Sequence, residues 1–98
     1  MPFLRKKYKI YALIDPRDKM PRFVGSTLCS TTDMIGFHVS RAELIPEDEK
    51  GQWISSLLKE GLRPIAKVLE RSYERKEAKR RWIRKLSFCP LLNKNLVG

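Results

Sequence analysis

The segment of residues 71–85 carries the densest group of charged side chains in the sequence. It holds 8 basic residues and 2 acidic residues, a net charge of +6. Such a density of positive charge attracts a polyanion through Coulomb energy and counterion release, which favours nucleic acid as partner. An anionic membrane surface is a weaker alternative. In the simplest alternative, the charged residues form a solvated helix face that binds no partner. The residues expected to contact phosphate are Arg75, Lys76, Arg80, Arg81, Arg84 and Lys85.

Two other side chains lie where chemistry is conceivable. Lys79 comes three and four residues before Trp82 and Ile83, which places its ammonium on the apolar face of a helix. Its stem can pack on the core while the charge reaches water, or this face can border a cleft. His38 also lies in an apolar stripe, where a structural histidine and a catalytic one are both compatible with the pattern.

The basic charge is local, and the rest of the sequence predicts one small folded domain. Residues 1–49 carry a net charge of +1 and residues 50–98 a net charge of +9. A hydrophobic fraction of 42% in 98 residues is enough for one core and exceeds that of a disordered tail. We expect a single domain over residues 1–98 with its core at about 7–93. No apolar run approaches the roughly 20 residues that span a membrane, so we expect no membrane partner. We expect a cytoplasmic protein, which would be associated with the nucleoid if it binds DNA.

The cysteines do not indicate a metal or redox centre. Cys29 and Cys89 are 60 residues apart and lack the paired spacing of a zinc site or a Cys-x-x-C motif. The chain has one histidine, so it cannot supply four zinc ligands unless carboxylates join. We interpret both cysteines as reduced thiols and expect no cofactor.

Three β runs and three helical stripes predict the fold. Residues 8–14 alternate between two faces, a turn-rich stretch with two prolines follows, and residues 22–27 complete a hairpin. Residues 64–71 are aliphatic and predict a third strand. The order β-β-α-α-β-α predicts an α+β domain in which three helices pack on a three-stranded sheet.

The helix boundaries follow from capping residues and apolar periodicity. Ser30 and the acid three residues later resemble a capping box at the start of a helix over about 31–45. The acids at 47–49 suit the positive end of a second helix that ends near Glu60. Ser72 is expected to cap a third helix over 73–86.

Several short motifs occur in an order that resembles a known family. They are Lys9-Ile10-Tyr11, Phe23-Val24-Gly25 after the hairpin, His38-Val39-Ser40-Arg41-Ala42, Trp53-Ile54, Glu77-Ala78-Lys79-Arg80-Arg81-Trp82-Ile83 and Leu91-Leu92-Asn93. Together with the element order, they look like the GIY-YIG endonuclease superfamily, and a small bacterial or phage branch is the most similar. The resemblance covers nearly the whole chain and implies a DNA-cleaving fold.

The resemblance implies roles for particular residues, and this chain departs from three of them. Members of the family use two motif tyrosines, a first-helix arginine, a metal-binding glutamate and an asparagine. Tyr11 matches the first tyrosine, which helps orient or deprotonate the attacking water, and Asn93 matches the asparagine. Phe23 keeps the second ring and loses its hydroxyl, so it cannot hydrogen-bond water or phosphate.

The two charged positions of the family pattern are altered as well. The arginine position falls on Met34 or Asp33, neither of which is cationic. Lys79 stands where the family has its metal-binding glutamate, and an ammonium repels Mg²⁺, which needs oxygen ligands. Glu77 does not replace the missing glutamate, because two residues along a helix turn the side chain by about 200°.

These departures favour a GIY-YIG-like domain that binds nucleic acid, DNA rather than RNA, without cutting it. Tyr11, Phe23, His38, Lys79 and Asn93 would then line a relic of the catalytic cleft. One alternative is an active Mg²⁺-dependent endonuclease that uses Tyr11, His38 and Asn93 with a carboxylate not yet placed. The other is a protein-interaction subunit or inhibitor within a nucleic-acid complex.

Overall fold

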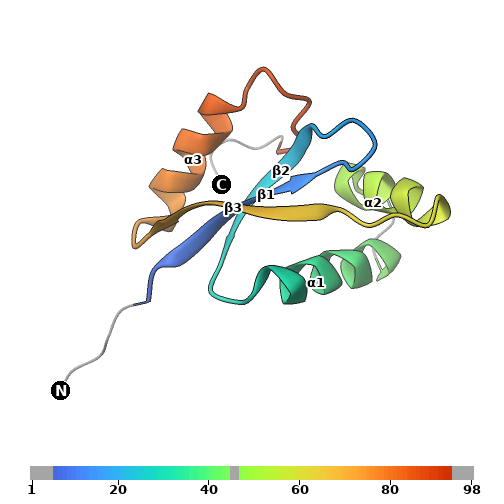
Figure 1. Cartoon of the computed structure of the whole chain (residues 1–98), viewed down its shortest axis with the longest axis horizontal. Helices are drawn as coiled ribbons and strands as arrows, with labels where there is room; N and C mark the ends of the chain where they lie inside the picture. Colours follow the sequence, from blue (N-terminus) through green and yellow to red (C-terminus); the bar gives the residue numbers. More distant parts are fainter. Residues whose placement is uncertain (1–5, 45–46, 94–98) are drawn as a thin grey trace.

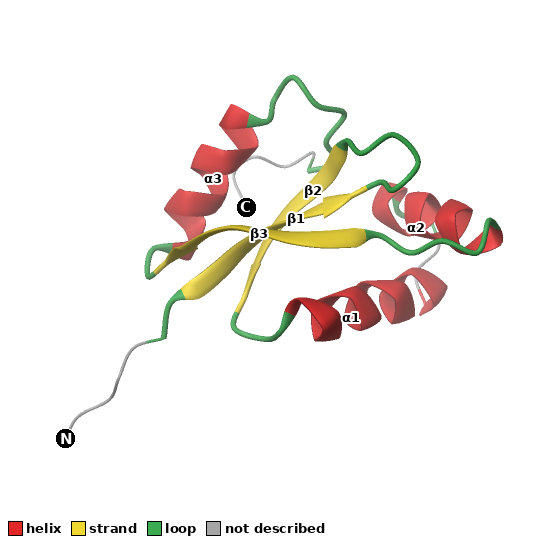
Figure 2. Ribbon diagram, viewed as in Figure 1, coloured by secondary structure: helices red, strands yellow, loops and turns green. Residues whose placement is uncertain are grey.

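The computed structural model describes residues 6–44 and 47–93, which form one antiparallel sheet packed by helices. This confirms the predicted α+β fold and the order of its elements (Figures 1 and 2). The elements are β1 (Tyr8–Ile14), β2 (Pro21–Thr27), α1 (Thr31–Leu44), α2 (Glu49–Lys59), β3 (Ile65–Ser72) and α3 (Arg75–Lys85).

Strand β1 lies at the centre of the sheet, between β2 and β3, and is antiparallel to both. Its side chains alternate between two cores, as period-two geometry requires. Tyr11 and Leu13 pack with the buried residues of α1 and α2, whereas Ile10 packs with Ala78 and Ile83 of α3. Helix α3 thus covers one face of the sheet, and α1 and α2 cover the other (Figure 1). Burial on both faces explains why β1 is apolar almost throughout.

Local hydrogen bonds set the helix starts and correct one expectation. The Ser30 hydroxyl accepts a hydrogen bond from the Asp33 amide at 3.1 Å, as the capping pattern predicts. The expected cap at Ser72 is wrong: its hydroxyl accepts from the Glu74 amide at 3.0 Å in a turn before the helix. Glu74 is the N-cap residue of α3 and its side chain makes no capping bond. Helix α3 therefore begins at Arg75, two residues later than predicted.

A buried carboxylate joins the β1–β2 hairpin to α2. Asp15, 1% exposed, accepts a hydrogen bond from the Trp53 indole Nε1 at 2.9 Å. It also accepts from the Arg17 amide, Nε and Nη2 at 2.9, 3.0 and 2.8 Å. The Arg17 guanidinium holds the pKa of Asp15 well below its usual range, against the effect of burial. Asp15 thus stays charged although it is buried, because hydrogen bonds from Arg17 and Trp53 replace those that water would make.

The cysteines agree with the expectation of reduced thiols. Cys29 is exposed, Cys89 is buried, and both are free thiols. Within residues 6–44 and 47–93, no helix is long and apolar enough to cross a membrane.

Candidate functional site

Tyr11 and His38 form a buried, neutral pair beneath the surface of the candidate site. The Tyr11 hydroxyl lies 2.8 Å from His38 Nε2, and the two residues are 2% and 5% exposed. Burial raises the pKa of Tyr11 to about 12. Burial, followed by the charges of Lys50 and Arg41, lowers the pKa of His38 to about 4. At neutral pH the pair is therefore a phenol hydrogen-bonded to an uncharged imidazole.

Gly25 makes room for this tyrosine. It lies directly opposite Tyr11 in the register between β1 and β2. A Cβ atom at residue 25 would lie 2.5 Å from the Tyr11 hydroxyl oxygen and 2.6 Å from Cζ. The Tyr11 ring thus lies across β2 in the space that a side chain would fill, and only glycine leaves that space empty.

Replacing Gly25 by alanine is expected to lower the free energy of unfolding by about 1–3 kcal/mol, because the buried ring is overpacked and its bond to His38 prevents it from moving aside. Urea unfolding followed by circular dichroism would measure this change. Gly36→Ala is the matched control, because a Cβ there meets nothing within 4 Å and α1 should gain about 0.5–1 kcal/mol. Equal stability changes in the two variants would contradict the assigned role of Gly25.

A small cleft opens beside Tyr11, between β2 and the first turns of α3. We call it the tyrosine cleft; its volume is about 270 Å³. It is lined by Tyr11, Phe23, Gly25, Ser26, Arg75, Lys76 and Lys79. The half-buried Lys79 ammonium has its pKa lowered by burial and by the charge of Arg75. The structure thus brings Tyr11, Phe23 and Lys79 together. His38 lies behind Tyr11, and its ring meets the Phe23 ring edge-on, with 5.5 Å between the two ring centres.

Asn93, expected in the relic cleft, is not among the residues that line it. Its side-chain oxygen accepts from the Val24 amide at 2.8 Å, and its nitrogen donates to the Val24 carbonyl at 3.0 Å. Both ends of the amide are therefore bonded to the backbone of β2. Asn93 therefore holds the last described residues of the chain against that strand.

Lys50 and Arg41 lie near the cleft and were not predicted as site residues. The Lys50 ammonium lies 4.5 Å from the centre of the Phe23 ring. Burial lowers the pKa of Lys50; Asp48 opposes this shift, and Arg41 and Lys79 add to it. The sequence contained a signal for Lys50, because it precedes Trp53 and Ile54 by three and four residues, just as Lys79 precedes Trp82 and Ile83.

The tyrosine cleft does not fit the Mg²⁺ ion that a GIY-YIG endonuclease would require. Its lining presents three cationic side chains and no carboxylate. Mg²⁺ is bound through carboxylates, phosphates and water, and it is repelled by fixed ammonium and guanidinium groups. Over residues 6–44 and 47–93, no three His, Cys, Asp or Glu side chains come together as a metal site. The arrangement suits an anion.

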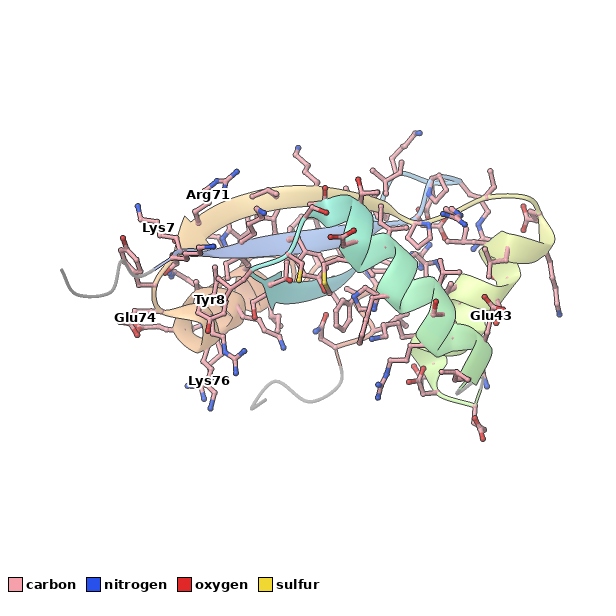
Figure 3. All side chains as sticks on the ribbon, turned by 90° about the horizontal axis from the view of Figure 1, so that it is seen from below. Lys7, Tyr8, Glu43, Arg71, Glu74 and Lys76 are labelled. Carbon is pink, nitrogen blue, oxygen red and sulfur yellow. The ribbon has the colours of Figure 1, made fainter. Side chains whose placement is uncertain are left out.

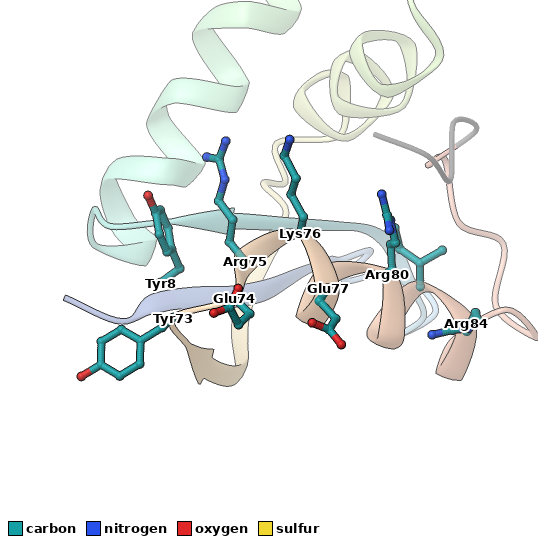
Figure 4. A pocket seen from close by; sticks show the side chains of 9 residues that line it. Tyr8, Tyr73, Glu74, Arg75, Lys76, Glu77, Arg80 and Arg84 are labelled. Carbon is teal, nitrogen blue, oxygen red and sulfur yellow. The ribbon is translucent and has the colours of Figure 1, made fainter. Parts of the chain in front are cut away.

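A larger hollow, about 850 Å³, runs along the exposed side of α3. We call it the α3 groove (Figure 4). Of the six residues expected to contact phosphate, four exposed ones line it: Arg75, Lys76, Arg80 and Arg84. Tyr8, Tyr73, Ile83, Glu74 and Glu77 complete the lining.

Three of the basic side chains of the α3 groove have a common direction. Arg75, Lys76 and Arg80 extend from the same side of α3, whereas Glu74 and Glu77 point away from them (Figure 4). In the view of Figure 3, Lys76 lies at the same end of the molecule as Lys7 and Arg71. Positive charge is therefore gathered on one face of α3 and at one end of the domain.

The other two expected residues, Arg81 and Lys85, do not line the α3 groove. Arg81 Nη1 lies 3.0 Å from Glu70 Oε1 in an ion pair, and the Trp82 indole donates to the same oxygen at 2.8 Å. The Lys85 ammonium lies 4.8 Å from the centre of the Trp82 ring. Arg81 and Trp82 thus attach α3 to β3 through Glu70.

Comparison of the chain with known protein families, with curated proteins and with solved structures gives no match. The likeness to GIY-YIG endonucleases therefore stays a prediction from the motifs of the sequence. What the site can do follows from its charges and contacts: it can hold an anion, while its neutral tyrosine and histidine are hydrogen-bonded to each other.

Proposed function

We propose that the protein binds nucleic acid along the α3 groove and does not cut it. The observation that carries this proposal is the set of four exposed cations that line the α3 groove. Residues four apart on a helix are separated by about 6 Å along its axis, similar to the rise of about two stacked nucleotides in one strand. Lys76, Arg80 and Arg84 follow this spacing, so they can contact every second phosphate of a strand that runs beside α3.

The chemistry of the tyrosine cleft supports binding without hydrolysis. Fixed cations can stabilise charge on a phosphate, but they do not lower the pKa of a bound water as a divalent ion does. Tyr11, with its pKa raised to about 12, is a poor general base at neutral pH. Phe23 has no hydroxyl to position water. We interpret the domain as a GIY-YIG-like fold that has kept its shape and lost its catalysis.

A salt-titrated binding assay tests this function. Labelled double-stranded DNA would be titrated with protein at several salt concentrations, with and without Mg²⁺, and the strand examined on a denaturing gel; a matched RNA duplex serves as the second ligand. Four phosphate contacts predict a slope of log affinity against log salt of about −3 to −4. We expect the same affinity in chelator and an intact strand.

Two outcomes would contradict the proposal in different ways. Absence of binding to both DNA and RNA at low salt would exclude nucleic acid as the partner of the α3 groove. Mg²⁺-dependent nicking that Tyr11→Phe abolishes would identify an active endonuclease instead, because Tyr11→Phe removes only the hydroxyl at the cleft.

A further inference from the structure

The tyrosine cleft and the α3 groove adjoin at the first turn of α3. Arg75 and Lys76 line both cavities. Arg80 and Arg84 line only the α3 groove, and Lys79 lines only the tyrosine cleft. A strand that lies in the groove therefore has a continuous cationic path into the cleft.

The tyrosine cleft concentrates charge in a small volume. Three cations share about 270 Å³, against four cations and two carboxylates along about 850 Å³ of the groove. Both burial and the neighbouring Arg75 disfavour the charged form of Lys79. An anion in the cleft would reverse this effect, and the hydroxyl of Ser26 lies in the same lining to donate a hydrogen bond to it. The cleft is large enough for a phosphate group and too small for a duplex.

The cationic path ends at Phe23. This ring lines the tyrosine cleft on one side and, on the other, a depression of about 290 Å³ that also contains Asp48, Glu49, Lys50 and Leu92. The two carboxylates outnumber the one ammonium in this depression, and its net negative charge disfavours a second phosphate there. A strand that enters the cleft from the groove thus meets two carboxylates and one ammonium, that of Lys50, beyond Phe23.

We propose that the tyrosine cleft binds the terminal phosphate of a nucleic-acid strand whose neighbouring phosphates lie in the α3 groove. This inference rests on the proposed function and names the part of the nucleic acid that the cleft recognises. A terminal phosphate carries a charge of about −1.5 to −2 at neutral pH, whereas an internal phosphodiester carries one negative charge. The extra charge matches the three cations of the cleft.

Competition between strand ends tests the proposal. Short single-stranded oligonucleotides of one sequence, with a 5′-phosphate, a 3′-phosphate or hydroxyls at both ends, would displace a labelled oligonucleotide from the protein. We expect one phosphorylated form to compete about tenfold better than the hydroxyl form, the effect of one added charge-assisted contact. Lys79→Met should abolish this preference, and Lys79→Arg should keep it. Lys67→Met, which removes an exposed lysine of β3, is the control expected to keep it.

Each contrary result has a distinct meaning. Equal competition by all three oligonucleotides would overturn the end site and leave binding along the α3 groove intact. A preference that survives in Lys79→Met, with the fold verified by circular dichroism, would overturn the role of the cleft. Inorganic phosphate that competes as well as the phosphorylated strand would overturn recognition of a strand end. Failure of every oligonucleotide to bind would refute the proposed function itself.

Discussion

Reversing the charges of Arg80 and Arg84 to glutamate is expected to lower nucleic-acid affinity about 100-fold at physiological salt, because two phosphate contacts are lost and two repulsive charges are added. The slope of log affinity against log salt should fall in magnitude by about 2. Both arginines are exposed and line the α3 groove without lining the tyrosine cleft. Fluorescence anisotropy titrations at several salt concentrations would measure affinity and slope together.

A matched double variant separates the groove from net charge. Arg63→Glu with Lys67→Glu changes the charge of the protein by the same amount at two exposed residues outside both cavities. Its affinity should stay within about threefold of the wild type, since long-range charge is screened beyond a Debye length. A similar loss in both double variants would mean that binding follows total charge and does not use the α3 groove.

Replacing Asp15 by alanine is expected to lower the free energy of unfolding by about 2–4 kcal/mol, because hydrogen bonds to a buried charged acceptor are lost and a buried donor is left unsatisfied. The substitution leaves the Trp53 indole nitrogen without its acceptor and removes the partner that orients Arg17. Urea unfolding would measure the change. In the control Glu60→Ala, the same arginine loses an ion-pair partner that is 54% exposed, and the cost should stay below about 1 kcal/mol. Equal losses in both variants would contradict the special role of Asp15.

Acid unfolding gives a second measure of Asp15. Because its pKa is depressed in the folded state, its contribution to stability is complete above the unfolded pKa of about 3.9 and is lost as the pH falls below it. His38 acts in a higher pH range. Its pKa is about 4 in the folded state and about 6.5 in the unfolded state, so between these values only the unfolded state binds the proton. The free energy of unfolding therefore decreases as the pH falls from about 6.5 to about 4. The Asp15→Ala variant should lose only the lower step.

The fold was predictable because its signals are local. The alternation of residues 8–14 and the apolar stripes at helical spacing identify faces that must be buried, and the structure buries them in two cores. The start of α3 was not predictable to the residue. Ser72 has the right side chain for a cap, but β3 continues through it and its hydroxyl is used in the turn that follows. Pairing with β1 decides where that strand ends, and this is a tertiary effect.

The candidate site was predictable where a single helix face carries the signal. A lysine before a Trp-Ile pair indicated Lys79, and the same rule applied to α2 would have indicated Lys50. Arg81 and Asn93 could not be placed this way. Their side chains are engaged by Glu70 of β3 and by the backbone of Val24, and neither partner can be inferred from spacing along one element.

The seat of Asn93 on β2 has a consequence for self-association. An edge strand exposes backbone groups that can pair with a strand of another molecule. Here the Asn93 amide satisfies both backbone groups of Val24, and the Leu92 amide donates to the Arg22 carbonyl at 2.6 Å. A second chain can add to β2 only after displacing these two residues. The opposite edge, β3, presents exposed Lys67 and Arg71, whose charges oppose pairing with a second copy. The sheet thus resists aggregation at the β2 edge because Leu92 and Asn93 already bind it, and at the β3 edge because like charges repel a second copy.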